Sequence, residues 1–354
     1  MLNLNYQKMQ KIIFLILFIA LCAPSLKAQS DPDVKVSEKS HVNPHARFVG
    51  KYEMEGNVIQ FALQKGTLVL IVPGAPLQEL ASVGENTFES TVFKDQHFVF
   101  AENGVKVTGV ISEDDRGTFK WKRISDNVEI LSMAMDSLLL LRKSTEHFLF
   151  LYSAIDSISV DKIAIDMEEN YKRILNDFKL KEIPKVSVRI YPDLQSFHKG
   201  INFPGAPGQV LATAFGKDDI RMVSPNNAGP EGWMLSHFAP HEFTHCVHLN
   251  IDYSPNNPRW LWEGVAQYEA GWFFDPAELG FIKEKQFPSF ADLNNGMEYM
   301  LGYVIIEAIK DLWGFDTVIG LIKSRGDVQK ILKTDETLFE KQIYEHIYKK
   351  YIKN

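Results

Sequence analysis

His241 and His245 stand four residues apart in the segment HEFTH. On a helix, residues at this spacing lie on one face, so both imidazoles can reach a single zinc ion at about 2.0–2.1 Å. Glu242 follows the first histidine, where its carboxylate can reach a water molecule on the ion rather than the ion itself. Zinc lowers the pKa of such a water towards about 7, so Glu242 is predicted to be the general base that moves its proton to a leaving amine.

A third metal ligand is expected in WLWEGVAQYEA, which occupies residues 260–270. Glu263 lies 18 residues after His245, which is enough for the chain to turn and return as an antiparallel helix. A His-His-Glu set leaves a fourth position open for water or substrate, as catalytic zinc sites require, and favours zinc over other divalent ions. Glu269 is the alternative ligand, but the two glutamates face different directions on one helix, so only one can serve. We therefore predict one Zn²⁺ per chain.

HEFTH followed by PRWLWEGVAQY resembles the gluzincin metallopeptidases, especially the peptidase MA-like superfamily related to the M1 aminopeptidases. The resemblance covers residues 147 to about 320 and implies that Glu263 is the third ligand, one position earlier than in the M1 enzymes. It also implies a tyrosine that donates a hydrogen bond to the oxyanion; YMLG at 299–302 puts Tyr299 in this role, with Tyr303 as the alternative. The strand before the metal helix, here 219–223, would lie along the substrate.

Other residues near this motif have structural explanations. His248 falls on the metal face but about 10.5 Å along the helix from His241, so we expect it to pack or to support a ligand rather than bind the ion. Cys246 points about 100° away from His245 and is expected to be a buried thiol. Pro240 would suit a first helical turn and would kink a longer helix.

The N-terminus has the layout of a secretory signal peptide over residues 1–28, in which Lys8 and Lys11 precede an apolar run and Ala28 ends the segment. The run is too short for a bilayer span of about 20 residues, and no later segment approaches that length, so no transmembrane segment is expected in the mature chain. We therefore predict a secreted or periplasmic protein. Lipid attachment at Cys22 is the less favoured alternative, because Leu21 stands where a small residue is required.

The net charge argues against a nucleic-acid-binding protein, and the cysteine content excludes a disulfide-stabilised one. Removing residues 1–28 takes away three lysines and no acidic residue, so the formal net charge falls from −7 to −10. A nucleic acid is therefore not an expected partner. Only Cys246 remains in the mature chain, so no disulfide can form within it.

Residues 47–124 consist of short β-branched and aromatic runs separated by turn residues, which predicts a small antiparallel β domain. FVGKYEMEGNVIQFALQKGTLVLIVPG, with VGENTFES and VTGV after it, resembles the small β module appended to serine β-lactamase-like and other secreted bacterial enzymes. Aromatic residues on strands are usually core, so no site is assigned here. The predicted strands are 58–63, 67–72, 87–93, 97–100, 105–111 and 118–122.

Residues 29–46 are expected to form a leader, 125–143 a linker and 144–354 the gluzincin-like peptidase domain. Strands are predicted at 147–152, 185–191 and 219–223, with helices at 161–178, around the HEFTH motif and from Tyr299 onward. The fold class is thus α+β: a small antiparallel β domain followed by a zincin-like domain with a helical C-terminal part.

The predicted function is zinc-dependent hydrolysis of peptide bonds in peptide or protein substrates by a secreted metallopeptidase. No GxMEN-type motif that would anchor a free N-terminus is found, so an endopeptidase is slightly favoured over an aminopeptidase. Two alternatives stay open: a catalytically silent binding or scaffold protein that retains the zincin fold, and a zinc hydrolase of a non-peptide bond. The sequence makes no prediction of oligomeric state.

Overall fold

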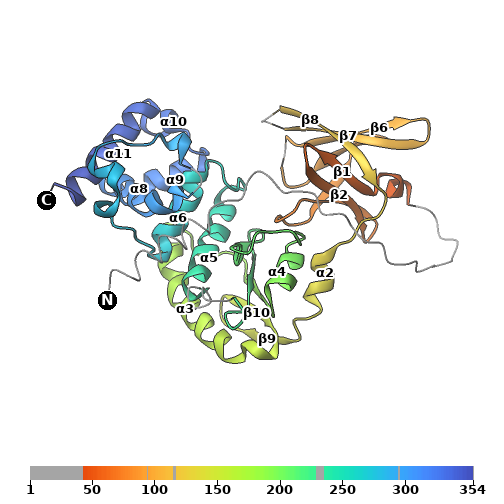
Figure 1. Cartoon of the computed structure of the whole chain (residues 1–354), viewed down its shortest axis with the longest axis horizontal. Coiled ribbons are helices and arrows are strands. Elements are labelled where there is room, and N and C mark those ends of the chain that lie inside the picture. The colour runs from red at the N-terminus through yellow and green to blue at the C-terminus, as the bar shows by residue number, and fades with distance from the viewer. Residues whose placement is uncertain (1–42, 94, 115–116, 229–234, 294–295, 354) are drawn as a thin grey trace. The chain divides into compact units, whose positions relative to one another are not determined.

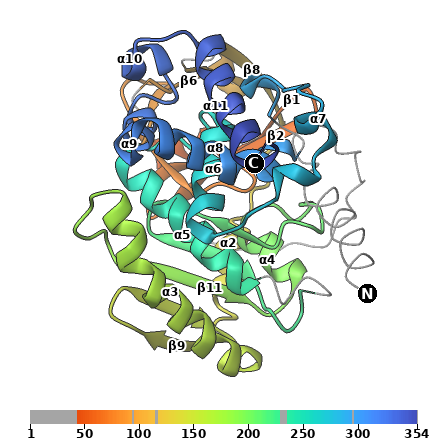
Figure 2. The same cartoon turned by 90° about the vertical axis from the view of Figure 1, so that its left-hand side faces the viewer.

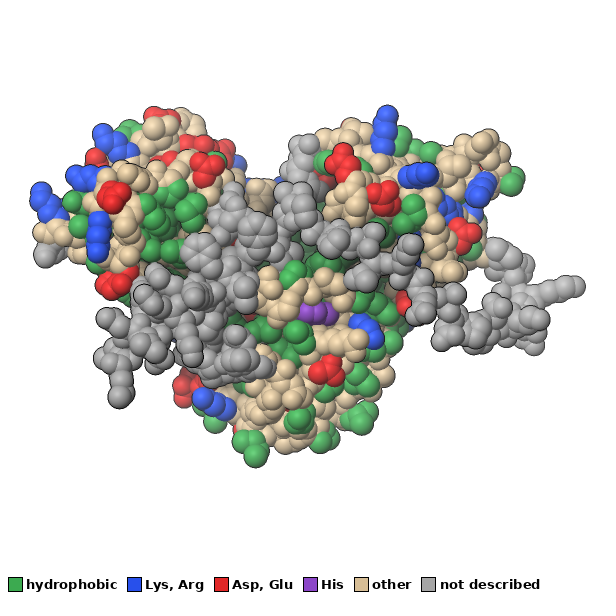
Figure 3. Space-filling model, in the orientation of Figure 1, with side chains coloured by type: hydrophobic (Ala, Val, Ile, Leu, Met, Phe, Trp, Pro, Cys, Tyr) green, Lys and Arg blue, Asp and Glu red, His purple; other side chains and the backbone are tan. Residues whose placement is uncertain are grey.

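The computed structural model describes residues 43–353 except 94, 115–116, 229–234 and 294–295 (Figure 1). The predicted signal peptide and most of the predicted leader lie outside the described residues. The described chain forms two compact units, one made of residues 43–134 and 201–204 and the other of 135–200 and 205–353. On the face shown in Figure 3, acidic and basic side chains are mixed on the surface of each unit.

The smaller unit contains the antiparallel β region that the sequence predicts. Each of its eight strands pairs with the next, and the last pairs with the first, which closes a barrel. The sequence does not predict two of the strands, β1 and β4. Both are short, and each buries one large apolar side chain, Tyr52 in β1 and Leu80 in β4, so neither has a clear alternating pattern. The elements are η1 (Pro44–Phe48), β1 (Gly50–Met54), β2 (Asn57–Gln64), β3 (Thr67–Ile71), β4 (Gln78–Ser82), β5 (Thr87–Ser90), β6 (His97–Asn103), β7 (Lys106–Asp114) and β8 (Gly117–Ser125).

Aromatic side chains fill the barrel. Phe61, Phe88 and Phe100 are fully buried, and their rings meet edge to face at centroid distances of 4.9 and 5.7 Å. Such contacts are favoured over face-to-face stacking and add to the burial of apolar area. The strand aromatics therefore form a packed core, as their alternation with polar residues indicates.

The larger unit is built on a five-stranded mixed sheet in the order β12-β13-β11-β10-β9. The three inner strands, β10 (Phe148–Tyr152), β11 (Val186–Tyr191) and β13 (Asp219–Val223), are parallel. The edge strands β9 (Leu141–Ser144) and β12 (Ala212–Ala214) are antiparallel to their neighbours. The stretch 125–143, expected to be a linker, contains α2 (Leu131–Asp136) and most of β9.

Helices complete this unit and make up the predicted helical C-terminal part. Helix α3 (Ser157–Asp177) runs along the sheet (Figure 2), and its Tyr171 packs between Phe148 of β10 and Phe243 of α5. None of the helices in the described part of the chain combines the length and apolar character that a bilayer span needs. The remaining helices are α4 (Leu194–Gly200), α5 (Leu235–Ile251), α6 (Arg259–Ala270), α7 (Gly280–Lys283), α8 (Met297–Trp313), α9 (Phe315–Lys323), α10 (Val328–Leu332) and α11 (Glu336–Tyr351).

Candidate metal centre

Helix α5 places the two histidines of HEFTH side by side. The helix is anchored by Phe243 and Val247, which are fully buried in the main core, so its rotation about its own axis is set by packing. His241 and His245 therefore project together, and their Nε2 atoms lie 3.1 Å apart. Both side chains are buried.

Helix α6 packs against α5 and adds the carboxylate of Glu263. Its Oε2 atom lies 3.3 Å from Nε2 of His241 and 3.6 Å from Nε2 of His245. Trp262 stacks on His245, with ring centroids 4.1 Å apart and planes 5° from parallel, so the imidazole is held in place from the side. In the described part of the chain, His241, His245 and Glu263 form the one group of three or more histidine, cysteine or acidic side chains that could hold a metal ion. These three residues are called the metal group.

A set of two imidazoles and one carboxylate fits a divalent cation. Although burial alone would raise the pKa of Glu263, the neighbouring imidazoles hold it well below its usual range, so this carboxylate is ionised. Burial lowers the pKa of His245 to about 4, which leaves its imidazole neutral. Glu263 Oε2 is buried and makes no hydrogen bond in the described residues. A buried anionic oxygen without a partner is costly, and a metal ion would satisfy it.

Two glycines let Glu263 and the helix carrying Tyr299 approach closely. A Cβ atom on Gly302 of α8 would lie 2.7 Å from Cα of Gly264, the residue after Glu263. Only glycine at these positions allows the two backbones to touch. Both glycines belong to the motifs WLWEG and YMLG, but the sequence does not reveal that they face each other.

Tyr299 is the tyrosine that α8 brings to the group. Its ring lies parallel to that of His241 within 18°, at a centroid distance of 6.3 Å. Burial and the nearby charge of Glu263 raise the pKa of Tyr299 well above the usual value, so the hydroxyl keeps its proton and can donate. Tyr303, the alternative, packs instead against Tyr268 at 5.1 Å.

Glu242 lies beside the group and against the edge of the sheet. Its Oε2 atom accepts a hydrogen bond from the backbone N–H of Ala214 in β12, at 2.6 Å. Burial raises the pKa of this carboxyl to about 7, because the charged form loses hydration. The sequence resemblance placed the substrate along 219–223, but β13 has neighbours on both sides. That prediction is wrong in this detail, since β12 is the edge strand beside Glu242.

The other candidate residues lie apart from the group of His241, His245 and Glu263. Glu269 is buried but forms an ion pair with Arg173 of α3 at 2.5 Å. His248 is buried beside Trp262, and its ring nitrogens have no hydrogen-bond partner in the described residues. The Cys246 thiol is buried, and burial raises its pKa well above the usual value, which makes it unreactive.

Pro240 lies inside α5, one turn after its start at Leu235, rather than at the first helical position. Because proline has no N–H, the helix loses one backbone hydrogen bond just before His241. In addition to its helical hydrogen bond, the carbonyl of Pro240 accepts one from the Thr244 hydroxyl at 2.9 Å. The helix therefore continues through Pro240, and the helical turn from His241 to His245 is intact.

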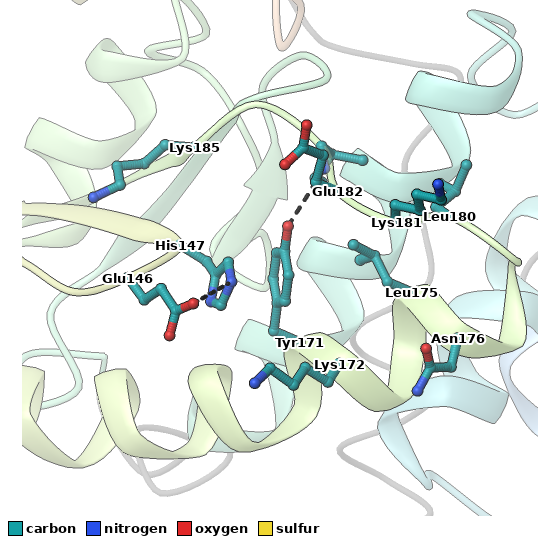
Figure 4. Close-up of a pocket in the computed structure, with 11 residues that line it drawn as sticks. Glu146, His147, Tyr171, Lys172, Leu175, Asn176, Leu180, Lys181, Glu182 and Lys185 are labelled. Carbon is teal, nitrogen blue, oxygen red and sulfur yellow. Dashed lines mark hydrogen bonds and ion pairs between the residues drawn. The ribbon is translucent and has the colours of Figure 1, made fainter.

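A separate concavity of about 480 Å³ lies between α3 and the segment leading into β11 (Figure 4). His147 stacks on Tyr171 there, with centroids 3.6 Å apart. The Nδ1 atom of His147 pairs with Glu168 at 2.6 Å, and the Tyr171 hydroxyl accepts the backbone N–H of Ile183 at 3.3 Å. The lining contains none of the three residues His241, His245 and Glu263, and the side chains of His147, Tyr171 and Lys185 in it already have partners in the protein.

Comparisons with known proteins found no match to this chain. No protein-family model matches the chain, and no curated protein has a similar sequence.

Proposed function

We propose that the chain is a zinc metallopeptidase of the gluzincin type, which hydrolyses bonds in peptide or protein substrates. The observation that carries the proposal is the buried Glu242 carboxylate beside the group formed by His241, His245 and Glu263. A structural zinc site has four protein ligands and needs no base. Three ligands with an adjacent carboxylate of raised pKa are what hydrolysis requires.

A zinc ion bound by the three ligands would supply a Lewis acid that makes water a nucleophile at neutral pH. Glu242 would act as the general base, accepting a proton from a water molecule beside the three residues and delivering it to the leaving amine. Its pKa of about 7 suits this work, because a general base is most effective when its pKa is near the operating pH. The hydrogen bond from Ala214 orients one carboxylate oxygen and leaves the other for proton transfer.

Two further elements provide substrate contacts. Among the described residues, β12 has a strand neighbour on one side only, so the backbone groups on its other side that do not already bond to Glu242 could pair with an extended peptide. Tyr299 keeps its hydroxyl proton and stands beside His241, where it can donate to the oxyanion that forms at the scissile carbonyl. One such donor is worth about 10²- to 10³-fold in kcat.

The proposal includes a zincin-like fold for the larger unit, with the ligands on α5 and α6 and the substrate on β12. It also includes export of the chain to a secreted or periplasmic location after cleavage at Ala28. Endopeptidase activity is favoured, because an edge strand holds the middle of a peptide and the sequence offers no motif for a free N-terminus.

Elemental analysis of the purified mature protein tests the metal site, and digestion of a mixed peptide library followed by mass spectrometry tests the activity. We expect one zinc per chain in the wild type and in Glu242→Gln, and none in Glu263→Ala. Of these three proteins, only the wild type should cleave peptides. Glu269→Gln is the matched control, since it changes an equally buried glutamate on the same helix and should keep both zinc and cleavage.

The outcomes separate the alternatives. Zinc without cleavage of any library peptide would favour a binding or scaffold protein. Zinc with no cleavage of library peptides, but with cleavage of ester or glycoside substrates assayed alongside, would favour a hydrolase of non-peptide bonds. A wild type without bound metal would refute the proposal.

A further inference from the structure

An ion pair joins the first turn of α6, the helix that carries Glu263, to the first turn of α8, the helix that carries Tyr299. Arg259 opens α6, and its Nε atom lies 2.6 Å from Oε1 of Glu298 in the first turn of α8. The other oxygen of Glu298 accepts the backbone N–H of Gly296 at 2.7 Å. The Glu298 side chain is 0% exposed and that of Arg259 is 38% exposed. Both oxygens of the carboxylate are thus satisfied in a geometry that a buried, charge-assisted pair holds rigidly.

Both members of the pair adjoin residues of the proposed site. Glu298 directly precedes Tyr299 in the chain, so the conformation of one restricts the other. Arg259 lies four residues before Glu263, which places the two on one face of α6. Its Nη2 atom is 4.0 Å from Oε1 of Glu263. The pair therefore connects the helical turn that carries the hydroxyl donor to the turn that carries the third ligand.

The pair is not required to bring α6 and α8 together. The backbones of Gly264 and Gly302 already touch at the middle of the interface. A buried ion pair is weak evidence for stability, because the loss of hydration offsets much of the attraction. What the pair adds is a fixed conformation at the start of α8, one turn before Gly302, where Tyr299 lies.

We propose that Arg259 and Glu298 are positioning residues, which hold the first turn of α8 so that the Tyr299 hydroxyl stays beside the metal group. Neither side chain needs to touch the substrate to act in this way. The inference rests on the proposed function for the role of the Tyr299 hydroxyl in catalysis. The placement of Tyr299 by the pair can be measured without any activity.

The chain provides a matched control on the same helix. Arg173 and Glu269 form a second pair between a 44% exposed arginine and a 0% exposed glutamate, at 2.5 Å. This pair ties the end of α6 to α3 rather than to α8. Removing either pair leaves one buried glutamine on α6 or α8, so both variants carry a similar structural penalty. Only the pair at the start of α8 should affect Tyr299.

The kinetic test compares Glu298→Gln with Glu269→Gln, after zinc loading and with kcat scaled to the folded fraction. For Glu298→Gln we expect one zinc per chain, KM within about 2-fold of wild type and kcat lowered roughly 10- to 100-fold, since a misplacement of 1 Å can cost 100-fold. Glu269→Gln should keep kcat. Combining Glu298→Gln with Tyr299→Phe should lower kcat little more than Tyr299→Phe alone, because the two changes remove one interaction.

Arg259→Lys is the conservative variant and keeps the positive charge without the planar fork. It should retain more of kcat than Glu298→Gln and remains informative if Glu298→Gln does not fold. Equal losses of kcat for Glu298→Gln and Glu269→Gln, or additive losses with Tyr299→Phe, would overturn the inference.

The spectroscopic test uses protein labelled with 3-fluorotyrosine, in which the Tyr299 fluorine resonance is assigned by its loss in Tyr299→Phe. We expect Glu298→Gln to shift or broaden this resonance and Glu269→Gln to leave it unchanged. If the wild type cleaves no peptide but the resonance responds in this way, the positioning role stands and the proposed function fails. A Tyr299 resonance that is the same in wild type and Glu298→Gln refutes the positioning role, whatever the activity.

Discussion

Replacing Gly302 by alanine should separate the two helices that frame the metal group. The added Cβ would lie 2.7 Å from Cα and 3.2 Å from N of Gly264. Carbon atoms in contact prefer about 3.5–4.0 Å, so α8 has to move away from α6 by roughly 1 Å. The obstructing atoms belong to the backbone and cannot rotate aside, so the strain reaches the whole interface.

The magnitude follows from two opposing effects. Overpacking of this kind typically costs about 1–3 kcal/mol, whereas alanine in place of glycine in a helix returns up to about 1 kcal/mol. We therefore expect the free energy of unfolding of Gly302→Ala to fall by about 1–2 kcal/mol. Tyr299 lies one turn from the substitution, so the shift should also move its hydroxyl away from His241.

Urea denaturation monitored by circular dichroism measures the stability change, and Gly320→Ala supplies the control. Gly320 lies inside α9, where an added Cβ meets only side-chain carbons of Ile331, the nearest at 3.3 Å. These atoms can shift, so Gly320→Ala should be as stable as the wild type or more stable. If Gly302→Ala matches Gly320→Ala in stability, the close contact of α6 and α8 does not set the geometry of the site.

Three further predictions concern buried groups in and around the proposed metal site. Burial lowers the pKa of His248 to about 3. The unfolded chain takes up this proton below about pH 6.5 and the folded protein does not, so stability is lost as the pH falls from 6.5. The loss at pH 5 is roughly 2 kcal/mol, and His248→Leu should remove it; an equal difference in urea unfolding between pH 7.5 and 5 in both proteins would contradict this. Chelation of zinc should lower the melting temperature of the wild type, by an amount equivalent to about 2.7 kcal/mol when free zinc had been at 100 times Kd, and should leave Glu263→Ala unchanged. Cys246 should react with a thiol reagent only after denaturation, because it is fully buried; rapid reaction of the native protein would show that α5 is more accessible than described.

Elements with a strong local pattern were predicted from the sequence. Apolar residues alternate with polar ones in β11 and recur at the helical period in α3, whereas β10 is a short apolar run. The observed bounds of these elements and of β13 lie within four residues of those expected. The three-residue strand β12 gives no such signal, because Ala-Thr-Ala suits a loop as well as a strand. It forms only because β13 lies beside it and supplies the hydrogen bonds.

For the site, the helical period alone makes His241 and His245 neighbours, and the motif WLWEG indicates Glu263. The spacing of residues on one helix depends only on local backbone geometry, so the sequence contains it in full. Whether Glu263 or Glu269 lies beside the two histidines depends on the rotation of α6 about its own axis where it packs against α5. The choice between tyrosines depends likewise on the rotation of α8.

These rotations result from contacts between residues far apart in the chain. Gly264 meets Gly302, and Arg259 meets Glu298, across 38 and 39 residues. No local pattern encodes such a pairing, because each residue would satisfy its own helix equally well with another partner. HEFTH and WLWEG therefore identify a candidate metal site and its ligands, whereas the packing of α6 against α8 places Tyr299 beside them and keeps Tyr303 away.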